Sequence, residues 1–313
     1  MLAKLLHLPE SLWNASLDNP IVYSELRIRM RIKRSRTLLA GSVLLTAGIL
    51  FLSARVMESG LGNSIDFTDV RGTARFFFGL VISTQLFIAT AIAPSAAASG
   101  IAGERERQTY DLLRTTTLRA GGIVWGKFLS ALAFTLLLIV AQTPFLMLAY
   151  IMGGPSLWEM VMHLAVITTS AIAYSALALF VSSRSKRTAA ATTGTYILIA
   201  LGTYILPLVG IMLVSFTTLA NASNTITIAG LHLNAEFLAT AISYLAAAIN
   251  APASMFASQS IFAESNAIFW DSTTINSHTL YYPLPWLITT LFNLLLSGFF
   301  LWLAKRNVQR QDI

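Results

Sequence analysis

The segment Gly121–Lys127 reads GGIVWGK and matches the first seven positions of the phosphate-binding P-loop pattern. In that pattern backbone amides cradle phosphates, the lysine reaches the outer phosphates, and a following Ser or Thr hydroxyl binds magnesium. Phe128 occupies the hydroxyl position here, and the segment runs into a long apolar stretch. The sequence therefore argues against a nucleotide site. It favours a glycine turn in which the Lys127 side chain reaches the cytoplasmic membrane surface.

The sequence contains few residue patterns that are typical of other catalytic sites. The four histidines are scattered without metal-ligand spacing, no cysteine occurs, and the H-E-x-x-H and G-x-S-x-G patterns are absent. Ionisable residues inside apolar stretches mark proton and ion relays, but here Arg55, Glu58, Glu159 and His163 lie near the ends of such stretches. We interpret His163 as a packing or interface residue. The sequence predicts a non-catalytic protein, without metal or cofactor of its own, that depends on an external energy source.

A charged insert, Gly103–Leu118, reads GERERQTYDLLRTTTL and separates two apolar stretches. Charged residues crowd its start and apolar residues its end. A short helix here would therefore have charged residues in its first turn and an apolar surface toward its end, an arrangement suited to docking onto another protein. The alternative is a solvated loop with pairs such as Arg107 and Asp111, worth about 0.2–0.5 kcal/mol each. Charge alone does not decide between the two.

The composition is typical of an integral membrane protein. Of its 313 residues 55% are hydrophobic and 11% are charged, with a mean hydropathy of +0.67, whereas soluble domains carry roughly 25% charged residues. Six apolar runs approach the roughly 20 residues that cross the hydrocarbon core. They are Thr37–Val56, Phe76–Ala98, Phe128–Met152, Met160–Val181, Ala189–Val214 and Trp286–Ala304. We predict an all-α integral membrane protein with six transmembrane helices in a single domain over residues 1–313.

The distribution of Lys and Arg predicts the orientation, because these residues are retained in the cytoplasm. Six spans place all but three of the 21 Lys and Arg residues on one side. The exceptions are Arg55, Arg71 and Arg75, in or beside a polar linker, Glu58–Arg75. Both termini and the insert are therefore predicted to be cytoplasmic, in a multi-pass protein of the cell membrane. The asymmetry also accounts for the net charge of +7 without a nucleic-acid partner.

Another nearly apolar segment, Phe237–Ala257, is long enough to be a seventh span. That arrangement would place the basic C-terminus outside. We favour a pair of short helices broken at Asn250–Pro252, re-entrant or lying at the outer surface, where other protein shields the broken backbone from lipid. This pair would belong to an extracytoplasmic region, residues 217–285.

The cytoplasmic N-terminus, residues 1–36, ends in the basic segment NPIVYSELRIRMRIKRSR. Apolar and basic residues alternate from Leu26 to Lys33, which taken alone is the period of a strand. A strand on a membrane would leave its edges unpaired, whereas a helix can bury apolar side chains while long arginine stems reach water. We favour an interfacial helix over a basic flank that only fixes topology. Its main residues are Glu25, Leu26, Arg27, Arg29 and Arg31.

The basic lead-in, the six spans and the insert together resemble the membrane permeases of ATP-binding cassette exporters of the type-two export class. Such permeases carry, after the second span, a loop similar to E-[KR]-E-[RK]-G-T-L-E-L-L-L-x-T-P-L-x, followed by a G-K that opens the third span. The matching residues here are Glu104, Arg105, Glu106, Arg107, Thr109, Leu112, Leu113, Thr116, Leu118, Gly126 and Lys127. The chain departs from the pattern at Gln108, where the class prefers Gly, and at Thr117, where it prefers Pro. Tyr110 and Asp111 replace the usual Leu-Glu pair.

The resemblance implies a half-transporter in which two permease subunits, identical or related, enclose a pathway. Separate ATPase subunits would bind ATP and magnesium and dock onto a coupling loop, residues 99–127. In this loop Tyr110, Leu112 and Leu113 would anchor a coupling helix in a cleft of the ATPase, while Glu104–Arg107 set polar contacts and register. The coupling residues implied are Glu104, Arg105, Glu106, Arg107, Thr109, Tyr110, Asp111, Leu112 and Leu113. The interfacial helix would correspond to the elbow helix of the class.

Two other functions remain open. The chain could be an ATPase-coupled membrane scaffold that acts on an extracytoplasmic partner through residues 217–285 without transporting anything. An ion-coupled carrier is the weaker alternative, because it would need intramembrane charges that the sequence lacks.

Overall fold

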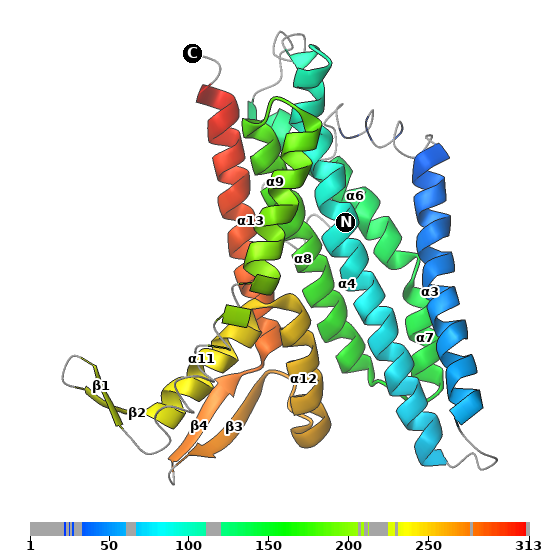
Figure 1. The fold of residues 1–313 in the computed structure, drawn as a ribbon, viewed down its shortest axis with the longest axis vertical. Coiled ribbons are helices and arrows are strands. Elements are labelled where there is room, and N and C mark those ends of the chain that lie inside the picture. The colour runs from blue at the N-terminus through cyan, green and yellow to red at the C-terminus, as the bar shows by residue number, and fades with distance from the viewer. Residues whose placement is uncertain are drawn as a thin grey trace, which may run out of the picture. The chain divides into compact units, whose positions relative to one another are not determined.

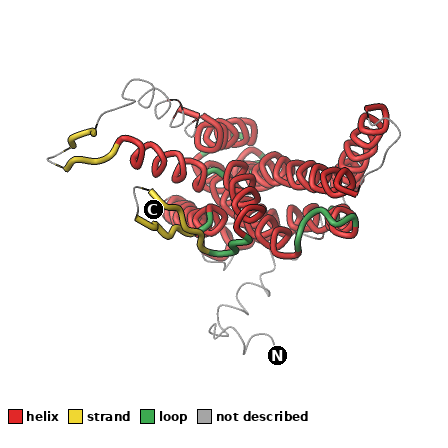
Figure 2. Tube along the Cα trace, turned by 90° about the horizontal axis from the view of Figure 1, so that it is seen from below, coloured by secondary structure: helices red, strands yellow, loops and turns green. Residues whose placement is uncertain are grey.

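A computed structural model of the chain describes most of its length. The described residues are 22, 25, 27, 33–60, 67–110, 120–205, 208–209, 212, 225–228, 231–275 and 278–310. Helices dominate this part of the chain, and its strands form two separate hairpins (Figures 1 and 2). The chain is organised as two compact units. Unit 1 comprises Met1–Ser156, Ser170–Tyr196 and Leu294–Ile313, and unit 2 comprises Leu157–Thr169 and Ile197–Asn293.

Five helical segments of the described chain are long and apolar enough to cross a bilayer. They are Ser35–Arg55, Val70–Glu106, Ala120–Ile151, Leu157–Arg184 and Pro285–Arg310. Each coincides with one of the six predicted spans. The remaining predicted span, Ala189–Val214, is helical through α9 (Thr188–Ala200) and a π-helical turn, η2 (Leu201–Ile205). The rest of it lies largely outside the described residues, so its passage across the membrane stays a prediction.

Unit 1 is built around α4 (Phe67–Glu106), which packs beside α3 (Lys33–Gly60), α6 (Ala120–Val140) and α7 (Thr143–Ile151) (Figure 1). Small side chains allow the close approach of these helices. One buried cluster consists only of alanines: Ala97, Ala98, Ala102, Ala131, Ala178 and Ala191. A Cβ added to Gly100 would lie 3.3 Å from Leu179 Cδ1, so the side chains around Gly100 leave little room for a larger residue.

Helix α4 is longer than its predicted span. Its 40 residues correspond to about 60 Å at 1.5 Å per residue, twice the roughly 30 Å of the hydrocarbon core. It includes Arg71 and Arg75, which the sequence assigned to a polar linker, and at its other end the first three charged residues of the insert, Glu104, Arg105 and Glu106. It also continues through Pro94, and the Ala91 carbonyl nearby accepts a hydrogen bond from the Tyr196 hydroxyl. A neighbouring helix thus supplies a donor beside a proline.

The predicted third span, Phe128–Met152, is two helices in the structure. Helix α6 ends at Val140 and α7 begins at Thr143, with Pro144 in its first turn. Proline cannot donate a backbone hydrogen bond and clashes with the preceding turn. Two short-range bonds, from Gln142 N to Ile139 O and from Phe145 N to Gln142 O, carry the chain across the break. Pro144 thus interrupts the helix more fully than a kink would.

Unit 2 contains the broken helix pair that the sequence predicts. Helix α11 (Ala235–Ile249) is followed by α12 (Ala251–Ser265), and Asn250 between them has extended backbone angles. The Asn250 side chain caps α12 by accepting from Ala253 N at 3.1 Å, and its amide donates to the Thr203 carbonyl of η2. The break is therefore confirmed where Pro252 follows. Its re-entrant or surface position in the membrane remains a prediction.

Two antiparallel hairpins precede and follow this helix pair in the sequence and are absent from the all-α prediction. The first joins β1 (Thr225–Ile228) to β2 (Leu231–Asn234), and the second joins β3 (Trp270–Ile275) to β4 (His278–Pro283) (Figure 2). The segments TITI, WDSTTI and HTLYYP are rich in the β-branched and aromatic residues that favour strands. They are too short to stand out beside long apolar runs.

The β3–β4 hairpin is fastened to α11 by aromatic residues. Tyr244 donates its hydroxyl to the Pro283 carbonyl, and its ring meets that of Tyr282 edge-on at 5.3 Å. Burial, followed by the charge of Tyr282, raises the pKa of Tyr244 to about 12. Burial and the Asp271 carboxylate also raise the pKa of Tyr282. Both phenols are therefore held in their neutral form in the folded protein.

Because the folded pKa of Tyr244 lies above its ordinary value of about 10, its stabilising contribution is complete below pH 10. It should be lost as the pH rises toward 12. We expect the midpoint temperature of unfolding in lipid nanodiscs to fall between pH 10 and pH 12. The fall should be smaller for the Tyr244→Phe variant. The control Tyr281→Phe alters the opposite, exposed face of the hairpin and should keep the wild-type loss. Equal pH profiles for wild type and Tyr244→Phe would contradict the contact's contribution.

Candidate functional site

The last turn of α4 gathers charged residues that the sequence assigned to the insert. Glu104, Arg105 and Glu106 end this helix, so they do not begin a separate short helix as expected. Each contacts a different part of unit 1: Glu104 reaches α6, Arg105 reaches the turn after α8 (Leu157–Arg184), and Glu106 reaches the start of α9. We call this junction the α4 terminus.

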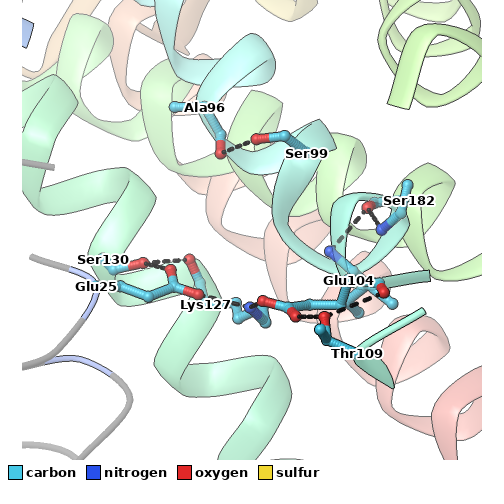
Figure 3. Close-up of polar contacts among 10 residues, drawn as sticks. Glu25, Ala96, Ser99, Glu104, Thr109, Lys127, Ser130 and Ser182 are labelled. Atoms are coloured by element: carbon cyan, nitrogen blue, oxygen red, sulfur yellow. Dashed lines mark hydrogen bonds and ion pairs between the residues drawn. The ribbon is translucent and has the colours of Figure 1, made fainter. Parts of the chain in front are cut away.

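Lys127 lies at the centre of the α4 terminus (Figure 3). Its ammonium group is 3.0 Å from Glu104 Oε1 and 2.5 Å from Glu25 Oε1. Ser130 donates its hydroxyl to the other carboxylate oxygen of Glu25 at 2.7 Å. Thr109 donates its hydroxyl to the remaining oxygen of Glu104. One buried cation thus joins the N-terminal segment, the end of α4 and the start of α6.

The Lys127 side chain is only 3% exposed, whereas those of Glu25 and Glu104 are 20% and 30% exposed. A buried ammonium is costly unless it is paired and hydrogen-bonded, and here two carboxylates supply that pairing. The Lys127 side chain is therefore buried against these two partners and does not extend into water. The segment Gly121–Lys127 is also helical throughout, so its backbone amides do not form a loop that could cradle phosphates.

Arg105 and Glu106 bind the connection between α8 and α9. Arg105 donates from Nη1 to the Ser185 carbonyl at 3.1 Å. The Glu106 carboxylate accepts from the Thr188 backbone amide at 2.9 Å and from its hydroxyl at 2.6 Å. Thr188 begins α9, so Glu106 provides a negative charge and an acceptor where helix amides lack partners. Deeper in unit 1, Ser182 Oγ accepts from the amides of Ile101 and Ala102.

The chain leaves α4 through a Schellman turn. Thr109 N donates to Glu104 O at 2.9 Å, and Gln108 N donates to Arg105 O at 3.0 Å, the two bonds that define this motif. Gln108 has a φ of +59°, in the left-handed region where glycine is favoured. The position at which the chain departs from the glycine of the resembled loop is thus the one position in this turn with a positive φ.

Tyr110 is packed inside the chain, with 7% of its surface exposed and the Arg105 guanidinium 4.9 Å from its ring centre. The described contacts therefore make Tyr110 part of the internal packing of the α4 terminus. Its predicted role as an anchor in a partner's cleft is untested. Asp111, Leu112 and Leu113 lie outside the described residues, so a coupling helix in the remainder of the insert also stays a prediction.

The predicted interfacial helix is described at only a few positions. Residues 22, 25 and 27 are helical, which agrees with a helix rather than a strand. Leu26, Arg29 and Arg31 lie outside the described residues. Glu25 was expected in this helix, but its pairing with Lys127, which is 102 positions away, was not predicted from the sequence. The unusual lysine in an otherwise apolar stretch was the available signal.

Buried polar groups also occur away from the α4 terminus. His163 is 2% exposed, and its Nδ1 lies 2.5 Å from the Glu159 carbonyl of the same helix turn. This contact agrees with a packing role. Gln85 and Gln142 are fully buried, and neither amide has a hydrogen-bond partner in the described part of the chain. Within the described ranges, no group of three or more His, Cys, Asp or Glu residues is arranged to hold a metal ion.

Composition, helix lengths and hydropathy together define a helical multi-pass membrane protein. Comparisons with known proteins do not assign it to a family: no family model matches the chain, and no curated protein matches it.

Removing the central cation should destabilise unit 1. Lys127→Met removes the cation that the Glu25 and Glu104 carboxylates share. We expect the free energy of unfolding, measured in mixed micelles, to fall by about 2 kcal/mol, less than for a fully buried pair because the carboxylates are partly exposed. Lys186→Met, at an exposed lysine in the α8–α9 turn, should change it by less than about 0.5 kcal/mol. Adding Glu25→Gln to Lys127→Met should recover part of the loss. A Lys127→Met protein as stable as the Lys186→Met control would contradict the role of the ion cluster.

The Schellman turn should become more stable with glycine at its left-handed position. Gln108→Gly removes a backbone penalty of roughly 1 kcal/mol, so exchange of the Thr109 amide hydrogen should slow several-fold. Gln108→Ala keeps a Cβ at the same φ and serves as the matched control. If the glycine variant exchanges faster than the alanine variant, the turn does not have this geometry in the membrane.

Proposed function

We propose that this protein is the membrane permease subunit of an ATP-binding cassette exporter of the type-two class. It would form the translocation pathway as a homodimer or heterodimer. ATP binding and hydrolysis, with magnesium, would take place on separate ATPase subunits that dock onto the coupling loop, residues 99–127. The observation that carries the proposal is the α4 terminus, because one short turn fastens that segment to several helices at once.

The contacts of the α4 terminus suit the transmission of force. A partner that pushes on the segment after Thr109 acts directly on Glu104, Arg105 and Glu106, since these residues lie just before it. Glu104 conveys the displacement to α6 through Lys127. Arg105 and Glu106 convey it to the ends of α8 and α9. Small movements of the docked ATPase would therefore reach four helices without requiring each to touch the partner.

The Glu25–Lys127 contact gives the N-terminal segment a place in the same mechanism. A helix lying on the membrane surface resists being pulled into the hydrocarbon or lifted into water, because both movements expose mismatched side chains. Anchoring Lys127 to such a helix would give α6 a fixed point against which α4 moves. The interfacial helix would then be the mechanical support of the coupling loop.

The Schellman turn also supports the resemblance. The resembled loop prefers Gly where this chain has Gln108, and the backbone there adopts the φ that glycine favours. A pattern position that demands a particular backbone angle is more informative than a match between charged residues. The substitution by Gln preserves the turn at a cost in local stability.

A second function is favoured by unit 2. Its helix pair and hairpins form a compact body inserted in the sequence between α9 and α13 (Pro285–Arg310), more elaborate than a link between two spans requires. Such a body could act on an extracytoplasmic partner while the ATPase supplies motion. In that case the protein would be an ATPase-coupled scaffold, and no cargo would cross.

The docking role of the insert can be tested with Leu112→Asp combined with Leu113→Asp. Charged side chains should prevent an apolar anchor from entering a cleft, because each buried carboxylate would lack a partner. For the wild-type chain we expect a co-purifying soluble subunit with an intact P-loop, identified by mass spectrometry after mild-detergent affinity purification. The double variant should lose at least 90% of it, on the order of a 1.4 kcal/mol loss in binding.

The matched control is Leu231→Asp with Leu233→Asp, the same change in the β1–β2 hairpin, which the predicted topology places across the membrane. It should keep the ATPase. Retention of the ATPase by the insert variant, or its absence from wild type under crosslinking, would overturn the proposal. Transport assays in proteoliposomes separate permease from scaffold: ATP-dependent movement of a labelled cargo supports the first, and coupled ATPase activity without movement supports the second.

A further inference from the structure

The β3–β4 hairpin carries an exposed aromatic face. Trp270 is 63% exposed and Tyr281 is 76% exposed. In the register of the hairpin Trp270 pairs with Pro283 and Ser272 pairs with Tyr281. Directly paired residues, and residues two apart in a strand, share one face of a sheet. Trp270, Ser272, Tyr281 and Pro283 therefore form a single surface, which we call the aromatic face.

The opposite face of the hairpin is occupied within unit 2. Asp271 accepts a hydrogen bond from the Tyr282 hydroxyl at 3.1 Å. Tyr282 packs against Tyr244 of α11. The two faces thus differ in kind, because one is packed against the protein's own helix while the other presents large amphipathic rings outward.

The hairpin lies next to the beginning of a membrane span. Strand β4 ends at Pro283 and α13 begins at Pro285, so the two are separated by no more than about 7 Å of chain. The Phe269 ring, just before β3, lies 5.9 Å from that of Trp286 in the first turn of α13. Trp286 also donates from Nε1 to the Ile268 carbonyl at 2.8 Å. These contacts hold the base of the hairpin at the start of the span.

The sequence of α13 places that start at a membrane boundary. Lys305, Arg306 and Arg310 mark its C-terminal end, where Arg306 lies over the Trp302 ring at 5.4 Å. Counting back from Lys305 by the roughly 20 helical residues that cross a 30 Å core reaches residue 285. Pro285 therefore lies at the opposite boundary, and the base of the hairpin lies at the level of the lipid headgroups.

We propose that the aromatic face is a lipid-binding surface that rests in the headgroup layer where α13 enters the membrane. Trp and Tyr suit this layer because one part of each ring system is apolar and the other donates a hydrogen bond. Ser272 between them adds little bulk and no charge. The hairpin would then hold unit 2 against the bilayer, with the Tyr244 and Tyr282 contacts passing that restraint to α11.

The absence of cysteine from the chain makes a spin-label test direct. A nitroxide on Ser272→Cys lies on the aromatic face and leaves both rings intact. The matched control is Thr274→Cys, two residues or about 7 Å farther along β3 from the base of the hairpin. Both full-length variants would be reconstituted in phosphatidylcholine nanodiscs. Electron paramagnetic resonance would compare collisions with oxygen, which enters lipid, and with a water-soluble nickel chelate.

We expect the oxygen-to-nickel collision ratio at position 272 to be roughly twofold or more above that at 274, because the headgroup layer is only several ångströms thick. Replacing Trp270 and Tyr281 by Ser should lower the ratio at 272 to the level of 274. If the double replacement does not fold, the comparison of 272 with 274 still decides. Equal, water-like ratios at both positions would overturn the proposal.

A second copy of the chain on the aromatic face would also overturn it. In that case the label at 272 would be immobilised and dipole-coupled to another label in detergent, before any lipid is added. The proposal depends on α13 crossing the membrane and not on an ATPase partner. Its outcome is therefore independent of the co-purification experiment.

Discussion

The buried ammonium of Lys127 is the constraint on which the described part of unit 1 most depends. A charge with 3% of its side chain exposed requires fixed counter-charges, so the positions of Glu25 and Glu104 are set relative to α6. These two residues come from segments far apart in the sequence. Their common requirement for Lys127 links the N-terminal segment to the end of α4. The polar groups that complete the cluster come from Ser130, in the helical turn after Lys127, and from Thr109, shortly after Glu104. A single side chain thus connects local helix structure to the tertiary arrangement.

The length of α4 gives this cluster its second property. Because the helix is about twice as long as the hydrocarbon core is thick, its length allows the charged last turn to extend beyond the apolar part of the membrane. Arg105 and Glu106 can then bind the α8–α9 connection in a region where charged groups are tolerated. The Schellman turn at Gln108 ends the helix immediately afterwards. Helix α4 therefore ends in a turn of defined geometry. A force on the segment after Thr109 would be transmitted to α4 through this turn.

The sequence was sufficient for features governed by local composition. Hydropathy located five of the described spans, and Asn250 with Pro252 predicted the break between α11 and α12 because proline cannot continue a helix. It was insufficient where distant residues determine the structure. Lys127 seemed able to reach water, because nothing in its neighbourhood revealed Glu25. The charged residues at the start of the insert were expected to begin a new helix, whereas they end α4. Charge composition does not distinguish these cases, because the position of a helix end depends on capping interactions. The hairpins were missed because strands of four to six residues give little periodic signal in an apolar chain.

The two regions of the chain constrain its function in different ways. At the α4 terminus the exposed residues, Glu106, Arg107 and Gln108, are polar, and Tyr110 is buried. An apolar contact with the proposed ATPase would therefore have to come from the segment that follows. On unit 2, by contrast, two large aromatic side chains of the β3–β4 hairpin, Trp270 and Tyr281, are exposed. An aromatic face resting on lipid is not available to a protein partner. A scaffold function would then require its partner to bind unit 2 at a surface other than the aromatic face. The permease function requires no such surface, and for this reason it remains the more economical account of both regions.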